Sequence, residues 1–295
     1  MLLVTGPTGN VGADLTRQLV DMGSDAPPYR LAGHHPDRLR AEYGDDVEVV
    51  PFAYDDRDTW PAALEGVDTL FLLFPLPKPK TARSWMAPFV AAAAEAGVRH
   101  VIYVTVPGAD KRKVVPHHHV EQAILASGMH HTFLRCGYFS QNLVRVISTH
   151  GVDIAEHDEV FVPAKDSTTT FLDSRDVAAA VITIVAEPEP HRGASYVLTG
   201  PEALTFGEVA EVLSDVLERP ITYVSPSIPS YVRRLRKRGV TWDTVLFMNV
   251  VYRLARSGVN AWSSEDLPKL LGRPATPFRE FAVDHRWRWD QQVWT

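Results

Sequence analysis

The chain has 295 residues, with 30 Lys and Arg against 36 Asp and Glu and a formal net charge of −6. This acidity argues against nucleic acid as the main ligand, because phosphate binding needs a clustered positive surface. The single cysteine, Cys136, excludes an intramolecular disulfide and a multi-cysteine metal site. No apolar run approaches the roughly 18 residues of a membrane span, and no basic stretch precedes the apolar N-terminal residues as in a signal peptide. A cytoplasmic globular protein is therefore expected.

Short apolar runs alternate with amphipathic stretches through the first 135 residues. Strands are predicted at residues 1–5, 29–33, 47–52, 69–74, 100–106 and 132–135. Helices are predicted at 10–22, 57–64, 82–96 and 115–126, with another that begins at Pro36. The strands are apolar on both faces, which is typical of a parallel sheet covered by helices on both sides. Right-handed crossovers then predict an α/β fold with a Rossmann-like, doubly wound parallel sheet.

The pattern changes near residue 150. Residues 160–172 indicate irregular or edge-strand structure, 173–187 and 206–217 helices, and 195–199 and 221–224 short strands. The chain beyond 225 is mostly helical and holds five of the seven tryptophans: Trp242, Trp262, Trp287, Trp289 and Trp294. We expect residues 1–150 to form the Rossmann domain, with its sheet completed by parts of 151–200. Residues 151–295 are expected to form a smaller, mostly helical substrate or cap region.

A glycine-rich loop follows the first predicted strand and opens the first predicted helix. Its glycines have the spacing G-x-x-G-x-x-G. Glycine lets the backbone turn tightly and approach a pyrophosphate, and the helix N-terminus offers N–H groups and a positive dipole end. The place of the loop, first in a βαβ series, indicates dinucleotide binding. The residues expected to contact the dinucleotide here are Gly6, Thr8, Gly9, Asn10, Val11 and Gly12.

The end of the second predicted strand bears on the choice of dinucleotide. An acidic residue there would bind the ribose 2′-hydroxyl of NAD, whereas a cation would accept the 2′-phosphate of NADP. The chain has no acid at this strand end, but it has His34, His35 and Arg38. The sequence thus favours NADP(H) and leaves NAD(H) open. Asp55, after the third strand, either contacts the adenine or caps a helix.

The catalytic patterns of several enzyme classes are missing. None of the nine tyrosines is followed by Lys at the fourth position, so standard Tyr–Lys carbonyl reduction has no support. Thr105 stands at the strand end where a catalytic serine often lies. Neither G-x-S-x-G nor H-E-x-x-H occurs, which leaves hydrolase and zinc-protease hypotheses without support.

Three consecutive histidines, residues 117–119, stand at a predicted helix start. Neighbours on a helix point about 100° apart, so the three cannot face one ion, and no metal site is expected. A histidine of this group, His117 first, is a candidate proton donor or gate near a nicotinamide. The alternative is a polar helix start. The basic run at 233–238 is predicted to be a solvated helix face rather than a nucleic-acid site.

Taken together, these segments resemble the NmrA-like atypical short-chain dehydrogenases/reductases, above all the bacterial NAD(P)H:quinone oxidoreductases of that family. The glycine loop, the His34-His35-Pro36 turn and the helix with His117-x-x-x-Glu121 carry the resemblance, as do residues 171–177 and 196–225. The most specific element is Leu134-Arg135-x-Gly137-Tyr138-Phe139-x-x-Asn142. The resemblance spans nearly the whole chain.

The resemblance implies an NAD(P)-binding domain, a small C-terminal domain and a substrate cleft between them. Phe74, Pro75, Thr105 and Val106 would border the cofactor, and Tyr138, Phe139 and Asn142 its nicotinamide end. The chain departs from the family at His34, where relatives often carry Arg. It departs again at Gln122, where many reductases of the wider group carry Lys.

The leading hypothesis is an NAD(P)H-dependent oxidoreductase that transfers a hydride to a small electron-poor acceptor, with a quinone as the first choice. Tyr138, His117 or water would deliver the proton. An iminium or enone acceptor is the alternative within the same family. A dinucleotide-sensing regulator without turnover, which binds a partner protein, is the alternative from another class. Neither nucleic acid nor a membrane is expected as a partner, and a homo-oligomer is left open.

Overall fold

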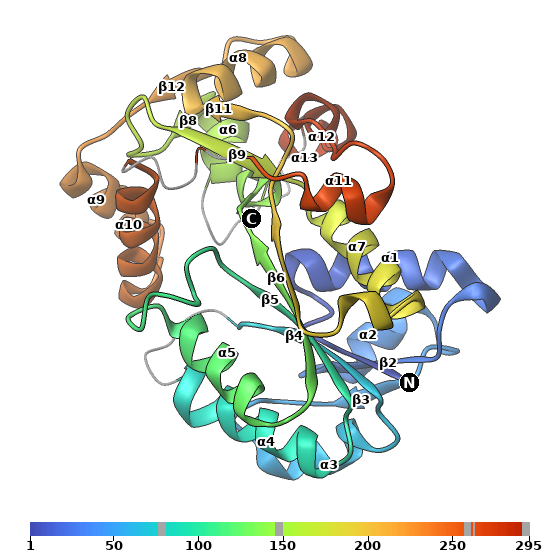
Figure 1. Cartoon of the computed structure of the whole chain (residues 1–295). Helices are drawn as coiled ribbons and strands as arrows, with labels where there is room; N and C mark the ends of the chain where they lie inside the picture. Colours follow the sequence, from blue (N-terminus) through green and yellow to red (C-terminus); the bar gives the residue numbers. More distant parts are fainter. Residues whose placement is uncertain (76–80, 145–149, 257–260, 262, 291–295) are drawn as a thin grey trace. The chain divides into compact units, whose positions relative to one another are not determined.

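The computed structural model describes residues 1–75, 81–144, 150–256, 261 and 263–290 (Figure 1). They form two compact units. The first consists of Met1–Cys136 and Arg175–Val197, and the second of Gly137–Ser174 and Leu198–Thr295. Within the described ranges, no helix combines the length and the apolar character needed to cross a membrane.

The first unit contains a seven-stranded sheet in the order β10-β6-β5-β4-β1-β2-β3. The strands are β1 (Leu2–Thr5), β2 (Tyr29–Gly33), β3 (Val49–Pro51), β4 (Thr69–Leu73), β5 (His100–Thr105), β6 (His130–Cys136) and β10 (Ala194–Leu198). From β3 to β6 each neighbouring pair is parallel. The chain runs outward from β1 in one direction and from β4 in the other, which confirms the predicted doubly wound fold and puts its switch point between these two strands.

Helices cover both faces of this sheet. They are α1 (Asn10–Met22), α2 (Pro36–Tyr43), α3 (Trp60–Leu64), α4 (Ala87–Glu95), α5 (Pro116–Ala126) and α7 (Ser174–Ala186). Helices α3, α4 and α5 lie on one face, and α1 and α7 lie on the other (Figure 1). On one face, Leu70 and Leu72 of β4 and Tyr103 of β5 belong to the same buried cluster as Phe89 of α4. The neighbouring residues Phe71 and Ile102, which point to the other face, are also fully buried. The strands are apolar on both faces for this reason.

Prolines account for the main differences from the predicted elements. The helix expected at 82–96 begins as a π-helical turn, Thr81–Met86, and becomes α-helical only at Ala87, because Pro88 lacks the N–H that a helix interior requires. The helix expected at 57–64 divides into a 3₁₀ turn and α3, which has Pro61 in its first turn. Strand β3 ends at Pro51, which has no ladder donor.

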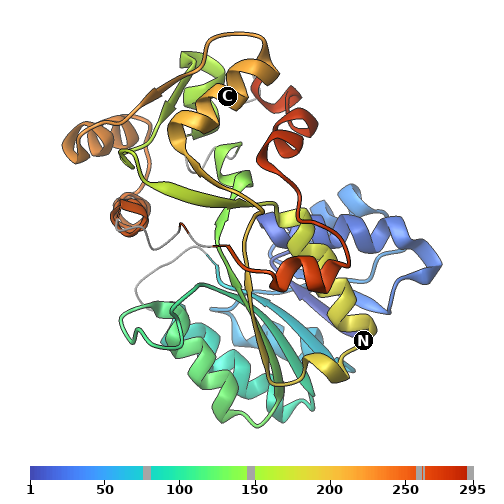
Figure 2. The ribbon, with the colours of Figure 1, turned by 45° about the horizontal axis from the view of Figure 1, so that its top comes forward.

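The second unit combines two small sheets with helices. Its elements are β7 (Tyr138–Phe139), α6 (His150–His157), β8 (Glu159–Phe161), β9 (Thr168–Leu172), β11 (Ala203–Thr205), α8 (Phe206–Leu217), β12 (Thr222–Val224), α9 (Ile228–Lys237), α10 (Trp242–Arg256), α11 (Asp266–Leu271), α12 (Phe278–Asp284) and α13 (Trp287–Asp290). Figure 2 shows α8 and α12 from another side. Strand β9 lies between β11 and β7, so the expectation of irregular or edge structure is wrong for 168–172. Cross-strand pairing, which is not local in sequence, decides this position.

The tryptophans of this unit have different environments. Trp289 is buried in the core and donates a hydrogen bond from Nε1 to the carbonyl of Leu143 at 3.2 Å. Trp242 and Trp287 are 62% and 46% exposed, while Trp262 and Trp294 lie outside the described residues. The three described tryptophans of this unit therefore range from the core to the surface.

Candidate functional site

The glycine loop closes tightly onto the first turn of α1. Gly6 follows β1 with a positive φ of 64°, and its carbonyl accepts a hydrogen bond from the Gly9 N–H at 2.9 Å. A Cβ atom at Gly12 would lie 2.8 Å from the Gly6 carbonyl carbon, and closer still to its oxygen. Gly9 is the N-cap of α1, and the first turn of the helix contains no acidic residue. The arrangement forms a cradle that fits a pyrophosphate.

The other loop residues differ in exposure. Thr8 is exposed, Asn10 is half-buried as the first residue of α1, and Val11 is buried. Val11 therefore contributes core packing, and Thr8 is the side chain of this loop most open to a ligand.

Exposed basic and aromatic groups follow β2. His34, His35 and Arg38 are all exposed, and the two imidazole rings lie 6.5 Å apart. The acid of this turn, Asp37, forms an ion pair with Arg40 at 2.9 Å. The end of β2 thus presents one guanidinium and two imidazoles to a ligand, whereas the nearby carboxylate is already paired with Arg40.

A half-buried tyrosine joins the two strands at the switch point. The Tyr54 hydroxyl lies 3.0 Å from Thr5 Oγ1 of β1 and donates to the Leu73 carbonyl of β4 at 3.0 Å. Burial raises the pKa of Tyr54, so its hydroxyl stays protonated. Tyr54 was not predicted to belong to the site, although a tyrosine that follows shortly after an apolar strand must find a partner for its hydroxyl. The neighbouring Asp55 is exposed.

Beyond β4 and β5 the predicted border residues lie at the same edge of the sheet. Phe74 stacks on the His117 ring, with centroids 4.4 Å apart and planes 28° apart. Pro75 and Val106 are half-buried next to the strand ends. Thr105 is 1% exposed and donates from Oγ1 to Glu121 at 2.9 Å, so its hydroxyl is committed to that carboxylate.

Glu121 is a second residue whose role was not predicted. Its carboxylate is 1% exposed and accepts a 3.0 Å hydrogen bond from Arg135 as well as the one from Thr105. Removing one partner of a buried ion pair leaves an uncompensated charge, so this cluster fixes the ends of β5 and β6 to α5.

The three consecutive histidines have three different partners. The Nδ1 atom of His117 lies 2.9 Å from the Tyr103 hydroxyl, and that of His118 lies 2.7 Å from the Ala109 carbonyl oxygen. His119 Nε2 lies 2.9 Å from Arg83. Among the described residues no group of three His, Cys, Asp or Glu could hold a metal ion. Burial lowers the pKa of His117 to about 3, so its imidazole is neutral at pH 7.

In the second unit, Tyr138 belongs to a chain of hydrogen-bonding groups. Its hydroxyl lies 3.1 Å from that of Tyr252, which in turn lies 2.5 Å from Nε2 of His150. Asn142 also hydrogen bonds to Tyr138, and burial raises the pKa of this tyrosine to about 12. The ring of Tyr138 packs against the core of the second unit, while Phe139 is half-buried. The Tyr138 hydroxyl is therefore neutral and already has two partners.

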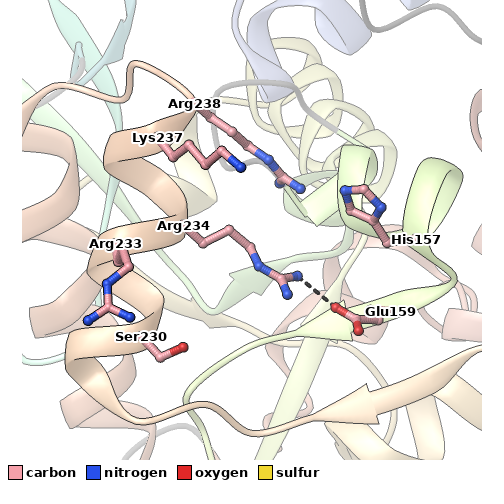
Figure 3. A pocket seen from close by; sticks show the side chains of 7 residues that line it. All are labelled: His157, Glu159, Ser230, Arg233, Arg234, Lys237 and Arg238. Atoms are coloured by element: carbon pink, nitrogen blue, oxygen red, sulfur yellow. Dashed lines mark hydrogen bonds and ion pairs between the residues drawn. The ribbon is translucent and has the colours of Figure 1, made fainter.

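The basic run at 233–238 lies on α9 and has two environments. Arg233, Arg236 and Lys237 are exposed, as predicted. Arg234 and Arg238 instead turn toward buried Asp153, at 2.9 Å and 2.7 Å, which the prediction of one solvated face missed. Figure 3 shows the hollow lined by His157, Glu159, Ser230, Arg233, Arg234, Lys237 and Arg238. Arg234 and Arg238 are paired with the carboxylates of Asp153 on α6 and Glu159 on β8. The basic run therefore mainly holds α9 against α6 and β8.

Known proteins are similar to the chain over almost its whole length. A model of the NmrA-like family matches residues 1–252. The NAD(P)H azoreductase of Xenophilus azovorans is 31% identical over 289 residues, which cover 97% of this chain and 98% of that protein. The (4-alkanoyl-5-oxo-2,5-dihydrofuran-3-yl)methyl phosphate reductase of Streptomyces griseus is 33% identical over 291 residues, with the same coverage. The NADPH-dependent quinone oxidoreductase of Escherichia coli, solved with NADPH, is 25% identical with a TM-score of 0.81, over 97% of this chain and 100% of that one.

Proposed function

Because the chain belongs to the NmrA-like family, we propose that it is an NAD(P)H-dependent oxidoreductase that transfers a hydride to a small electron-poor acceptor. The observation that carries the proposal is the closed cradle of Gly6, Gly9 and Gly12 at the carboxyl end of β1. This cradle lies at the switch point of a doubly wound sheet, where such folds bind their ligands. The bound dinucleotide supplies the hydride, and the protein binds and orients the reactants.

A quinone is the acceptor that best suits the side chains. Hydride transfer to a quinone yields an aromatic product, so the reaction makes little demand on a strong general acid. The chain has no Tyr–Lys pair, and the Tyr138 hydroxyl is neutral with two partners. The names of the relatives, an azoreductase and a quinone oxidoreductase among them, support an electron-poor acceptor of this kind.

NADPH is proposed as the preferred donor. Exposed His34, His35 and Arg38 follow β2, and the nearby Asp37 is paired with Arg40. A charged hydrogen bond contributes about 1.5–3 kcal/mol, so one contact from Arg38 to a 2′-phosphate would favour NADPH roughly tenfold or more. The relative of known structure that was solved with NADPH supports this choice.

Paired titrations test both parts of the proposal. Dialysed protein is titrated with NADPH and NADH, and the oxidation of each is then followed with a quinone, an azo compound, an iminium and an enone. Tight NADPH binding and fastest turnover with the quinone are expected. Faster turnover with the iminium or the enone would show that this compound class, and not a quinone, is the acceptor. Tight binding without any turnover would favour a dinucleotide-sensing regulator. The absence of a Tyr–Lys pair is consistent with that alternative.

A further inference from the structure

His117 is positioned at the edge of the sheet where the dinucleotide is expected. It lies in the first turn of α5, and its ring stacks on Phe74, which follows β4. The side chain is half-buried, so part of it stays open to the surface. One ring nitrogen, Nδ1, lies 2.9 Å from the Tyr103 hydroxyl. Among the described residues, the other nitrogen, Nε2, has no hydrogen-bond partner.

The hydroxyl of Tyr103 determines which nitrogen carries the hydrogen. Tyr103 is fully buried on β5, and among the described residues its one hydrogen-bond partner is His117 Nδ1. If Nδ1 carried the hydrogen, the tyrosine O–H would be buried without an acceptor. An unsatisfied buried donor shifts the equilibrium between the two tautomers against that arrangement by a factor on the order of ten or more. The Tyr103 O–H therefore donates to Nδ1, and the hydrogen of the neutral ring is on Nε2.

We propose that Tyr103 holds His117 as the Nε2–H tautomer, and that this N–H donates a hydrogen bond to the acceptor oxygen on which negative charge develops. Tyr103 is thus a positioning residue, and His117 touches the substrate. The inference rests on the proposed function and assigns a role within that site. A fixed neutral donor aimed at a developing oxyanion stabilises the transition state without having to reorganise.

The proton balance distinguishes this role from that of a proton donor. Hydride transfer brings two electrons and one hydrogen to the quinone and leaves an oxyanion, which takes one proton to become the hydroquinone. If His117 gave up its Nε2 proton, Nδ1 would have to take the proton of Tyr103 and leave a fully buried phenolate. Burial holds the pKa of Tyr103 well above its usual value, so this transfer is disfavoured. Water therefore supplies the proton, and His117 supplies only the hydrogen bond.

The tautomer can be measured without any substrate. Protein labelled with ¹⁵N-histidine is studied at pH 7 by two-bond ¹H–¹⁵N correlation, and the His117 signals are assigned by their loss in His117→Gln. The expected result is an Nε2–H ring in the native protein and a mixed or Nδ1–H ring in Tyr103→Phe. Tyr196→Phe is the matched control, because Tyr196 forms a separate pair with Nδ1 of His191 at 2.8 Å. The control should leave the His117 signals unchanged.

Kinetics with the quinone test the donor role. Tyr103→Phe and His117→Phe should each lower kcat about tenfold, the effect of losing one neutral hydrogen bond. His117→Gln, which keeps an N–H donor, should retain more activity than His117→Phe. Thermal unfolding verifies that each variant is folded. A native Nδ1–H or doubly protonated ring, or a tautomer unchanged in Tyr103→Phe, would overturn the tautomer assignment. A changed tautomer with unchanged kcat would overturn the donor role. If the native protein reduces no acceptor, the proposed function and the donor role fail together, while the NMR result still decides the tautomer.

Discussion

Replacing Gly12 by alanine should separate the first turn of α1 from the glycine loop. The added Cβ atom would lie 2.8 Å from the Gly6 carbonyl carbon, whereas ordinary van der Waals contact begins at 3.4 Å. The helix must therefore move by well over half an ångström, which is enough to break hydrogen bonds that need 2.7–3.2 Å. Overpacking of this kind costs about 1–3 kcal/mol of stability. Loss of two charged hydrogen bonds to the pyrophosphate removes at least about 3 kcal/mol of binding free energy, or roughly 150-fold in Kd.

A second glycine provides the control for this experiment. Gly207 also lies in a helix, α8, but a Cβ atom there would meet its nearest neighbour, Thr205 Oγ1, at 3.6 Å. Gly207→Ala should therefore fold and bind normally, with a gain in stability of up to about 1 kcal/mol from helix propensity. Calorimetric titration with NADPH and urea unfolding measure both variants. If Gly12→Ala binds NADPH within threefold of the native protein, the cradle is not the pyrophosphate site.

Three further outcomes follow from individual side chains. Arg38→Ala should weaken NADPH about tenfold and leave NADH unchanged in the same titrations; equal losses would remove Arg38 from 2′-phosphate recognition. Tyr252→Phe should lower the free energy of unfolding by about 1–3 kcal/mol, because buried His150 Nε2 loses its partner; an unchanged urea midpoint would contradict this. Burial lowers the pKa of His100 to about 4 and that of His150 to about 3. Below pH 6.5 the unfolded chain therefore binds protons that the folded chain does not, and urea unfolding should show about 1.4 kcal/mol less stability per pH unit for each group. A flat profile from pH 6.5 to 5 would refute this reasoning.

Features that depend on neighbouring residues could be predicted from the sequence. The expected helix at 10–22 and strand at 29–33 have the bounds of α1 and β2. The glycine spacing indicated a phosphate cradle, because a tight turn between a strand and a helix is a local property of the chain. Prolines changed the expected bounds where they removed a backbone donor, as at Pro88 and Pro51.

The partners of the site's polar side chains could not be predicted, because they come from distant parts of the chain. The histidine run suggested a candidate in His117, but its tautomer depends on Tyr103, which reaches it only because β5 and α5 pack together. Likewise, Tyr252 meets His150 from 102 positions away. The sequence by itself thus determined the doubly wound fold and the tight glycine loop between β1 and α1, through short-range periodicity and glycine spacing. Only the tertiary structure decided which hydroxyls, carboxylates and imidazoles are paired, because burial forces each polar group to find a partner wherever the fold supplies one.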